Sequence, residues 1–227
     1  MSKQSIECVG VIMDGNRRWA REKGKPIFEG HRAGYDTLAQ VVKWAREADV
    51  KNVIAYTFST ENWQRSEDEV GYLLKLFKFV VESEADRMVA EQVRVKFVGE
   101  RERFSKDLQE GMNRIEAITE KSYKITLYLA VSYGGRAEIL HATNTLLGEG
   151  AKSVTAEEFS KKLWTYPMPD PDLIIRTGGV MRLSGFLPWQ AIYSELFFLG
   201  TMWPDFSETE FQNILKEYAD REQRHGK

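Results

Sequence analysis

The chain has little of several features that would point to particular classes of protein. Cys8 is the only cysteine among 227 residues, so an internal disulfide is excluded and a reducing, cytoplasmic location is expected. No apolar run approaches the roughly 18 residues of a membrane-spanning helix, and the N-terminus lacks the apolar core of a signal peptide. Lys and Arg number 32 against 34 for Asp and Glu, so no overall positive field indicates a nucleic-acid partner. Any anion site must be built locally.

Several common catalytic motifs are also missing. The sequence has no Gly-rich dinucleotide fingerprint, no P-loop lysine motif, no His-Glu-x-x-His, no paired cysteines for zinc and no Gly-x-Ser-x-Gly elbow. These absences argue against the corresponding nucleotide, zinc and serine-hydrolase chemistries. Cys8 is expected to fill space in a buried strand, and His141 is expected to be structural.

Apolar runs alternate with helical patterns along the chain. The runs that predict strands lie at about 6–12, 52–58, 93–98, 125–131, 172–176 and 195–199, and the helical patterns lie at about 31–49, 69–91, 101–121, 135–148, 155–164 and 207–223. This alternation predicts one α/β domain over 1–227, with a mostly parallel sheet covered on both faces. Ligands of such sheets bind beyond the carboxyl ends of the strands, where Asp14, Ser59, Ser132 and Arg176 fall.

The most informative segment runs from Val11 to Trp19, Val-Ile-Met-Asp-Gly-Asn-Arg-Arg-Trp. Asp14 can hold a divalent cation, while the arginines and the free N–H groups of a helix start suit a diphosphate ester. Taken alone, Asp-Gly-Asn is also common turn chemistry. His31 opens the next helical pattern, and a lone histidine there is more often a cap or a structural residue than a catalytic one. The arginines that follow the turn favour the diphosphate interpretation.

Two later segments carry similar chemistry. The segment from Ser59 to Arg65, Ser-Thr-Glu-Asn-Trp-Gln-Arg, follows a predicted strand. It holds more side chains able to bind a ligand than an ordinary loop does. Arg176 ends a buried strand, and Arg182 follows six residues later. Because a buried arginine is costly unless an anion meets it, these two arginines predict a second phosphate clamp, distinct from the first. Glu195, just before Leu-Phe-Phe-Leu, is either a metal ligand or a strand-edge charge.

Taken together, these segments resemble the cis-prenyltransferase family, of the undecaprenyl diphosphate synthase type. The resemblance runs from about residue 8 to the end and rests on Met13–Ala20, Gly30-His31, Phe58–Trp63, Ser132–Arg136, Arg176–Gly179, Arg182–Ser184, Trp189-Gln190, Tyr193–Leu196 and Trp203–Phe206. It implies a homodimer whose subunits each hold a six-stranded, mostly parallel sheet surrounded by helices, with an apolar tunnel. The implied reaction is a Mg²⁺-dependent cis addition of isopentenyl diphosphate to an allylic prenyl diphosphate, with release of diphosphate.

The resemblance also implies roles for individual residues. Asp14 and Asn62 are the implied catalytic residues, and Asp14 and Glu195 the implied Mg²⁺ ligands. The implied substrate-binding residues are Gly15, Asn16, Arg17, Arg18, Trp19, His31, Ser59, Thr60, Glu61, Trp63, Arg65, Arg176, Arg182, Leu183 and Ser184. Among them, residues 15–18 and His31 would hold the allylic diphosphate. Arg176, Arg182 and Ser184 would hold the diphosphate of the acceptor. Residues 224–226, Arg-His-Gly, would reach the partner subunit's site.

Five positions depart from the usual family pattern, namely Ile27, Ser132, Val180, Met181 and Gly185. Three of them, at 180, 181 and 185, replace the usual Glu, His and Asn around the second clamp. The resulting pattern resembles branch members that perform irregular, head-to-middle coupling with dimethylallyl diphosphate as acceptor. This alternative stays open beside regular elongation. A non-catalytic partner subunit is a third alternative, which the retained aspartate and arginines argue against.

The helical pattern over 69–91 bears on product length. Tyr72, Leu73, Leu76, Phe77 and Val80 recur at helical spacing, either as tunnel lining or as ordinary core. Two phenylalanines, at 77 and 79, are candidates to close a short tunnel. The sequence leaves chain length open, together with any peripheral membrane contact through a lipid product.

Overall fold

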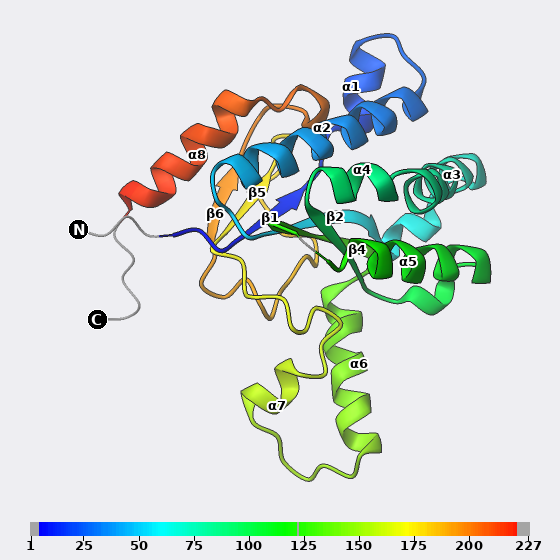
Figure 1. Ribbon diagram of the computed structural model, residues 1–227, viewed down its shortest axis with the longest axis vertical. Helices are drawn as coiled ribbons and strands as arrows, with labels where there is room; N and C mark the ends of the chain where they lie inside the picture. The colour runs from blue at the N-terminus through cyan, green and yellow to red at the C-terminus, as the bar shows by residue number, and fades with distance from the viewer. Residues whose placement is uncertain (1–4, 122, 222–227) are drawn as a thin grey trace.

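The computed structural model describes residues 5–121 and 123–221 (Figure 1). Within them, six strands form one parallel sheet in the order β3-β4-β2-β1-β5-β6. The strands are β1 (Cys8–Ile12), β2 (Asn52–Ser59), β3 (Val93–Val98), β4 (Ile125–Tyr133), β5 (Leu173–Arg176) and β6 (Glu195–Phe198). The prediction of a single α/β domain built on a six-stranded, mostly parallel sheet is confirmed.

The helices follow most of the predicted patterns. They are α1 (Asn16–Glu22), α2 (Ile27–Glu47), α3 (Glu67–Ser83), α4 (Ala85–Ala90), α5 (Lys106–Thr119), α6 (Gly135–Gly148), α7 (Ala156–Ser160) and α8 (Glu208–Asp220), with short 3-10 turns η1 (Thr60–Gln64), η2 (Arg101–Arg103) and η3 (Trp203–Asp205). The pattern predicted over 69–91 is divided, because α3 ends before Glu84 and α4 begins after it. The helix predicted from residue 31 begins at Ile27, after Pro26. His31 therefore lies inside α2 and does not cap it.

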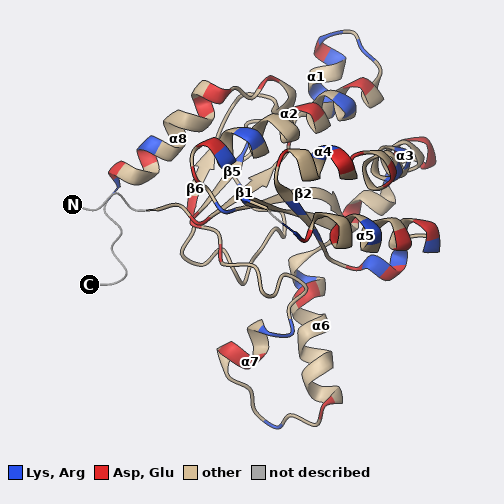
Figure 2. Cartoon of the chain, viewed as in Figure 1, with Lys and Arg blue, Asp and Glu red and all other residues tan. Residues whose placement is uncertain are grey.

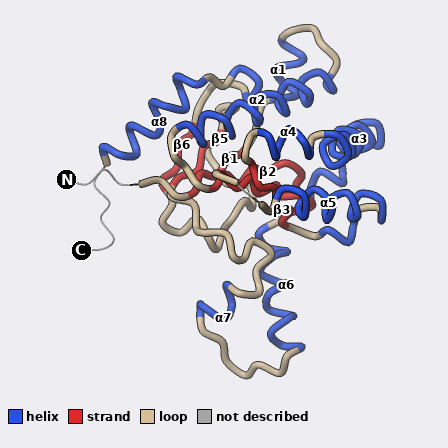
Figure 3. The backbone as a smooth tube through the Cα atoms, viewed as in Figure 1, coloured by secondary structure: helices blue, strands red, loops and turns tan. Residues whose placement is uncertain are grey.

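The two faces of the sheet are covered differently. Because side chains alternate along a strand, Val9 and Val11 enter a large core with α2, α5 and α8, whereas Cys8 and Ile12 face the other side. There they pack against side chains of the segment 161–191, and Cys8 is fully buried in β1, as the sequence predicts. Figure 3 shows helices above the sheet and mostly loop below it.

Helices α6 and α7 project from the rest of the domain and enclose a small apolar cluster of their own (Figure 1). Figure 2 shows charges of both signs spread over the helices above the sheet, whereas most of α6 is uncharged. His141 lies on α6 with its ring 5.1 Å from that of Trp164. No helix within the described residues is long and apolar enough to cross a bilayer.

The register of the sheet brings three strand ends together. Ile12 at the end of β1 pairs with Tyr56 on β2 and with Arg176 at the end of β5. The chain beyond β1 then packs closely against α2, where a side chain at Gly30 or Gly34 would collide with Asn16. The carboxyl edge of the central strands therefore gathers segments that are far apart in the sequence.

Candidate active site

The carboxylate of Asp14 lies at the centre of this edge. Gly15, with φ of 117°, turns the chain from β1 into α1, and a side chain there would meet the sulfur of Met202. Asp14 Oδ1 accepts a hydrogen bond from Arg18 at 3.1 Å, and its Oδ2 accepts one from Arg176 at 3.0 Å. One carboxylate thus joins the arginines of both predicted phosphate clamps. The two predicted clamps therefore adjoin at Asp14.

A polar cavity of about 520 Å³ opens around Asp14. Five arginines line it, namely Arg17, Arg18, Arg21, Arg65 and Arg176. The carboxylate of Asp14 is the only one among its lining residues. Guanidinium groups bind phosphate oxygens through paired N–H donors, so this excess of positive charge favours a multiply charged anion such as a diphosphate.

Most of the predicted site residues border this cavity. Those that line it are Asp14, Gly15, Asn16, Arg17, Arg18, His31, Ser59, Asn62, Arg65, Arg176 and Ser184. The others lie outside its lining and are Trp19, Thr60, Glu61, Trp63, Arg182, Leu183 and Glu195. Trp19 donates its indole N–H to Asp205 at 2.7 Å. Glu61 is exposed, and Leu183 packs with the apolar cluster under the sheet.

Arg176 organises the second clamp. Its side chain is 6% exposed, and its NH1 group donates to the carbonyl of Arg182 and to Ser184 Oγ, the latter at 2.8 Å. The guanidinium of Arg182 is exposed and donates from Nε to Ser184 Oγ at 3.3 Å. The loop is therefore folded around Arg176, with Ser184 lining the cavity and the Arg182 side chain exposed beside it.

The loop after β2 is fixed by side-chain hydrogen bonds. Asn62 Oδ1 accepts from the backbone N–H of Ser59 at 3.1 Å, which caps the short turn η1. Trp63 donates its indole N–H to Ser132 Oγ at 3.0 Å. The Trp63 ring packs edge-on against Phe58, so it supports the loop from the core side. Ser132, one of the unusual positions, therefore anchors η1 to β4.

Glu69 is a site residue that the sequence analysis missed. Its side chain, 8% exposed, accepts from Arg65 at 2.9 Å, contacts His31 Nε2 at 3.2 Å and lies 3.7 Å from Arg17. Burial lowers the pKa of His31, so its imidazole is neutral at pH 7. Glu69 ties α1, α2 and η1 to α3. Its only sequence signal is a carboxylate in the first turn of a helix, which is common.

The two predicted metal ligands do not meet within one chain. Glu195 begins β6 and pairs with Leu173 at the start of β5, so it lies at the amino edge of the sheet, opposite Asp14. Its carboxylate contacts Arg221 at 2.5 Å. Among the residues that the structure describes, no cluster of three or more His, Cys, Asp or Glu side chains suits a metal. The predicted element at 224–226 lies outside the described residues.

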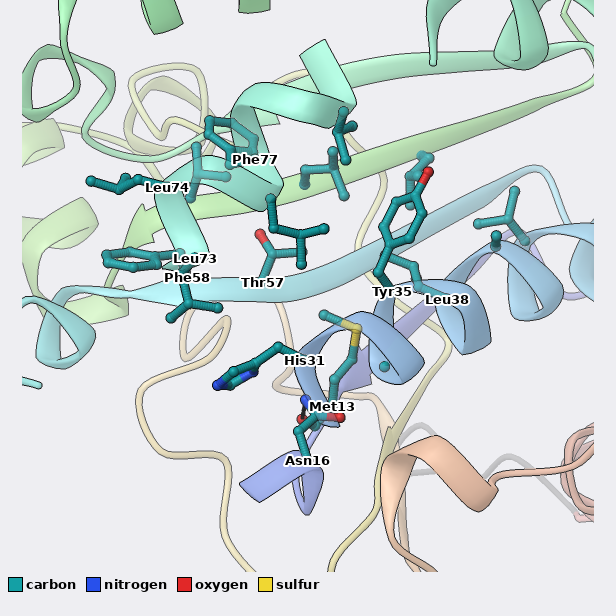
Figure 4. A pocket seen from close by; sticks show the side chains of 18 of the residues that line it. Met13, Asn16, His31, Tyr35, Leu38, Thr57, Phe58, Leu73, Leu74 and Phe77 are labelled. Atoms are coloured by element: carbon teal, nitrogen blue, oxygen red, sulfur yellow. Dashed lines mark hydrogen bonds between the residues drawn. The ribbon is translucent and has the colours of Figure 1, made fainter. Parts of the chain in front are cut away.

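An apolar cavity of about 130 Å³ adjoins the polar one (Figure 4). The two share Met13, Asn16, His31, Thr57 and Leu73 in their walls. Further apolar lining comes from α2, α3 and β4 and includes Leu38, Val42, Leu76, Phe77, Val80, Leu127 and Leu129. A diphosphate in the polar cavity can thus direct a hydrocarbon tail into the apolar one.

A polar cavity lined by arginines, with an apolar cavity behind it, suits an enzyme whose substrate has a phosphate head group and a hydrocarbon tail. Residues 12–226 match the family model described as putative undecaprenyl diphosphate synthase, and the chain belongs to this family of cis-prenyltransferases. The isoprenyl transferase of Neisseria gonorrhoeae is 41% identical over 96% of this chain and 88% of that protein. The family and the transferase activity predicted from the sequence are confirmed.

Two solved structures are also similar. The lavandulyl diphosphate synthase of Lavandula x intermedia, in complex with dimethylallyl diphosphate, has a TM-score of 0.92 and 28% identity, and the match covers 98% of each chain. A probable undecaprenyl diphosphate synthase of Campylobacter jejuni has a TM-score of 0.83 and 28% identity, over 99% of this chain and 100% of that one.

Proposed function

We propose that this enzyme condenses an allylic prenyl diphosphate with isopentenyl diphosphate in cis and releases diphosphate. The observation that carries the proposal is the position of Arg176. It bridges Asp14, beside the first group of arginines, and Ser184, in the second clamp, at a cavity that adjoins an apolar one. Two diphosphates held on either side of Arg176 would bring the allylic carbon and the acceptor alkene together, which accelerates the reaction by proximity.

The residues present suit the charge that develops during the reaction. When the allylic C–O bond breaks, negative charge builds on the departing diphosphate. Arg17, Arg18 and Arg65 are placed beforehand to stabilise it, more in the transition state than in the ground state. The new C–C bond forms to the acceptor alkene, and the proton that the acceptor then loses passes to an oxygen of the released diphosphate. We assign that side of the reaction to the loop of Asn62, which faces the same cavity.

Asp14 fits a role in binding Mg²⁺. This cation is held in proteins by one or two carboxylates together with substrate phosphates. Each Asp14 oxygen accepts one hydrogen bond from an arginine, and a carboxylate oxygen can offer a second lone pair. When bound, the cation would supply Lewis-acid stabilisation of the leaving diphosphate. Glu195 is not assigned to this site, because within one chain it lies at the opposite edge of the sheet.

Irregular coupling with dimethylallyl diphosphate as acceptor is a second candidate. Val180 and Met181 bring apolar side chains to the loop beside Arg176, and Met181 is 79% exposed. Gly185 offers no side chain there, and its carbonyl is occupied by Gly135 N–H at 2.8 Å. The similar lavandulyl diphosphate synthase structure holds dimethylallyl diphosphate, the acceptor that this second candidate requires.

Product analysis separates the candidates. The enzyme is incubated with Mg²⁺, a panel of allylic diphosphates and labelled isopentenyl or dimethylallyl diphosphate, and the dephosphorylated alcohols are identified by mass spectrometry. Linear cis alcohols that carry label from isopentenyl diphosphate support regular elongation, and branched alcohols from dimethylallyl diphosphate alone support irregular coupling. No product from any combination would refute both and favour a non-catalytic partner subunit. Chelation of Mg²⁺ by EDTA is expected to stop turnover.

We also propose that the enzyme is a homodimer. β6 forms one edge of the sheet, and Ile192 (73% exposed), Tyr193 (75%) and Leu196 (39%) lie beside or on it. Exposed apolar side chains along an open strand edge are typical of an interaction surface. Sedimentation velocity should give twice the 26.2 kDa of one chain, and a monomer at micromolar concentration would contradict the proposal.

A further inference from the structure

The backbone carbonyl of Asp14 is held from two sides. The hydroxyl of Thr177 donates a hydrogen bond to this oxygen at 2.7 Å, and the backbone N–H of Trp203 donates to it at 3.1 Å. Thr177 is fully buried and directly follows Arg176, the last residue of β5. Two neighbouring residues therefore hold Asp14, because Arg176 binds its carboxylate and Thr177 binds its main chain.

Gly178, the next residue along the chain, packs against the other partner of the Asp14 carboxylate. A Cβ atom at Gly178 would lie 2.5 Å from NH2 of Arg18 and 3.0 Å from the Asp14 carbonyl oxygen. Its φ of 82° lies in the left-handed region, which glycine adopts without strain. Three successive residues, 176–178, thus contact Asp14 or its partner Arg18.

The hydrogen bond from Thr177 leaves little freedom to the Asp14 peptide. The two oxygens lie 2.7 Å apart, whereas a carbon atom needs about 3.3–3.6 Å from a carbonyl oxygen. A methyl group in place of the hydroxyl would therefore push the Asp14 carbonyl away by roughly 0.6 Å or more. Groups at a reacting centre must be held within about 0.5 Å of their productive position. Loss of this hydroxyl is therefore expected to affect catalysis as well as stability.

We propose that Thr177 is a positioning residue whose hydroxyl holds Asp14 where its carboxylate can bind the cation. This inference rests on the proposed function, in which Asp14 binds Mg²⁺ beside the leaving diphosphate. Thr177 is not among the residues that line either cavity, so it acts through Asp14 and not on the substrate. Loss of a hydrogen bond that orients a metal ligand typically costs about 10–100-fold in metal affinity or activity.

Three variants of Thr177 separate the hydroxyl from the rest of the side chain. Thr177→Val keeps the volume and removes the hydroxyl. Thr177→Ala removes the hydroxyl without a clash, and it serves if the valine variant does not fold. Thr177→Ser keeps a hydroxyl and should restore the function.

Thr119→Val is the matched control. Thr119 is 1% exposed and lies on α5, and it lines neither cavity. Its hydroxyl donates to the Ile115 carbonyl at 2.8 Å and accepts from the Val95 N–H at 3.1 Å. The control therefore loses at least as much buried hydrogen bonding as Thr177→Val, but at a distance from Asp14.

Turnover is measured as transfer of label from isopentenyl diphosphate over a range of Mg²⁺ concentrations. We expect Thr177→Val and Thr177→Ala to lower kcat about tenfold or more and to require more Mg²⁺ for half-maximal activity. Thr177→Ser should stay within about threefold of the wild type. Thr119→Val should keep the wild-type values, although its melting temperature falls. Wild-type kcat in both Thr177→Val and Thr177→Ala, or an equal loss in Thr177→Ser or in Thr119→Val, would overturn the inference.

A binding measurement tests the same role without turnover. The thermal shift caused by inorganic pyrophosphate is recorded with and without Mg²⁺, and the difference reports binding of the cation. The wild type, Thr177→Ser and Thr119→Val should show this difference, and Thr177→Val should lose most of it. The same difference in Thr177→Val, or none in the wild type, would refute the positioning role. A wild type that shows the expected pattern of shifts but forms no prenyl product would instead refute the proposed reaction.

Discussion

Replacement of Asp14 by alanine should nearly abolish turnover while the protein remains folded. The variant loses the acceptor for two charge-assisted hydrogen bonds, from Arg18 at 3.1 Å and Arg176 at 3.0 Å, together with the proposed cation ligand. Loss of one such electrostatic contact at a reacting centre costs about 10²–10³ in kcat. Removing one partner of a fully buried ion pair costs about 3–5 kcal/mol in stability.

The stability cost is expected to be smaller here. The side chain of Asp14 is 30% exposed, and Arg176 keeps its bonds to the carbonyl of Arg182 and to Ser184. We therefore expect a loss of about 1–3 kcal/mol, since part of the Asp14 charge is screened by solvent. At about 2–4 °C per kcal/mol for a chain of this size, the melting temperature should fall by roughly 2–12 °C.

Initial rates of label transfer at saturating substrate measure kcat, and a thermal melt measures stability on the same preparation. Asp14→Asn keeps the size of the side chain and removes its charge, so it should lose nearly as much activity as alanine. Asp36→Ala is the matched control, because Asp36 is 60% exposed and pairs only weakly with Arg32 at 3.5 Å. A kcat for Asp14→Ala above about one tenth of the wild-type value would refute the assigned role.

Two further outcomes concern buried groups. Glu138 is fully buried and accepts hydrogen bonds from Tyr133, from Gln190 and from both the backbone N–H and the hydroxyl of Thr165. Glu138→Ala leaves these donors without an acceptor and should lower the free energy of unfolding by about 3 kcal/mol. The melting temperature should then fall by about 6–12 °C. A fall in the melting temperature of less than about 2 °C, measured by calorimetry, would contradict this prediction for Glu138→Ala. Burial lowers the pKa of His31 from its ordinary value of 6.5. The unfolded chain therefore binds a proton at this histidine more readily than the folded protein does. The free energy of unfolding should fall as the pH drops below about 6.5. Urea unfolding between pH 5 and 8 should show this slope in the wild type and lose it in His31→Gln.

The sequence predicted the strands well because the signal for a buried strand is local. An apolar run of four to eight residues bounded by polar ones identifies each strand, and the order of the strands along the chain implies that they are parallel. Asp14 and Arg176 could be placed at one edge by the same argument, since each follows or ends its strand. Glu195 begins its strand, so the same rule puts it at the opposite edge of the sheet.

Other features depend on contacts that no local pattern contains. The break between α3 and α4 coincides with Glu84, whose carboxylate is bound by Tyr35 from 49 positions earlier in the chain. Glu69 is positioned in the site by three partners, Arg17 on α1, His31 on α2 and Arg65 just after η1. Neither glutamate belongs to a motif with a chemical signature, so periodicity assigns each to an ordinary helix.

Asp14 joins the two clamps, because it accepts hydrogen bonds from an arginine of each. Arg18 and Arg176 hold Asp14 through the same N–H groups that a diphosphate would recruit. An anion that takes over these donors frees the lone pairs of Asp14 that now accept them, and a freed carboxylate beside an anion is a better ligand for a cation. Under the proposed function, binding of the diphosphate would therefore also prepare Asp14 to bind the cation. The fold can keep a buried arginine at the end of β5 because Asp14 balances its charge.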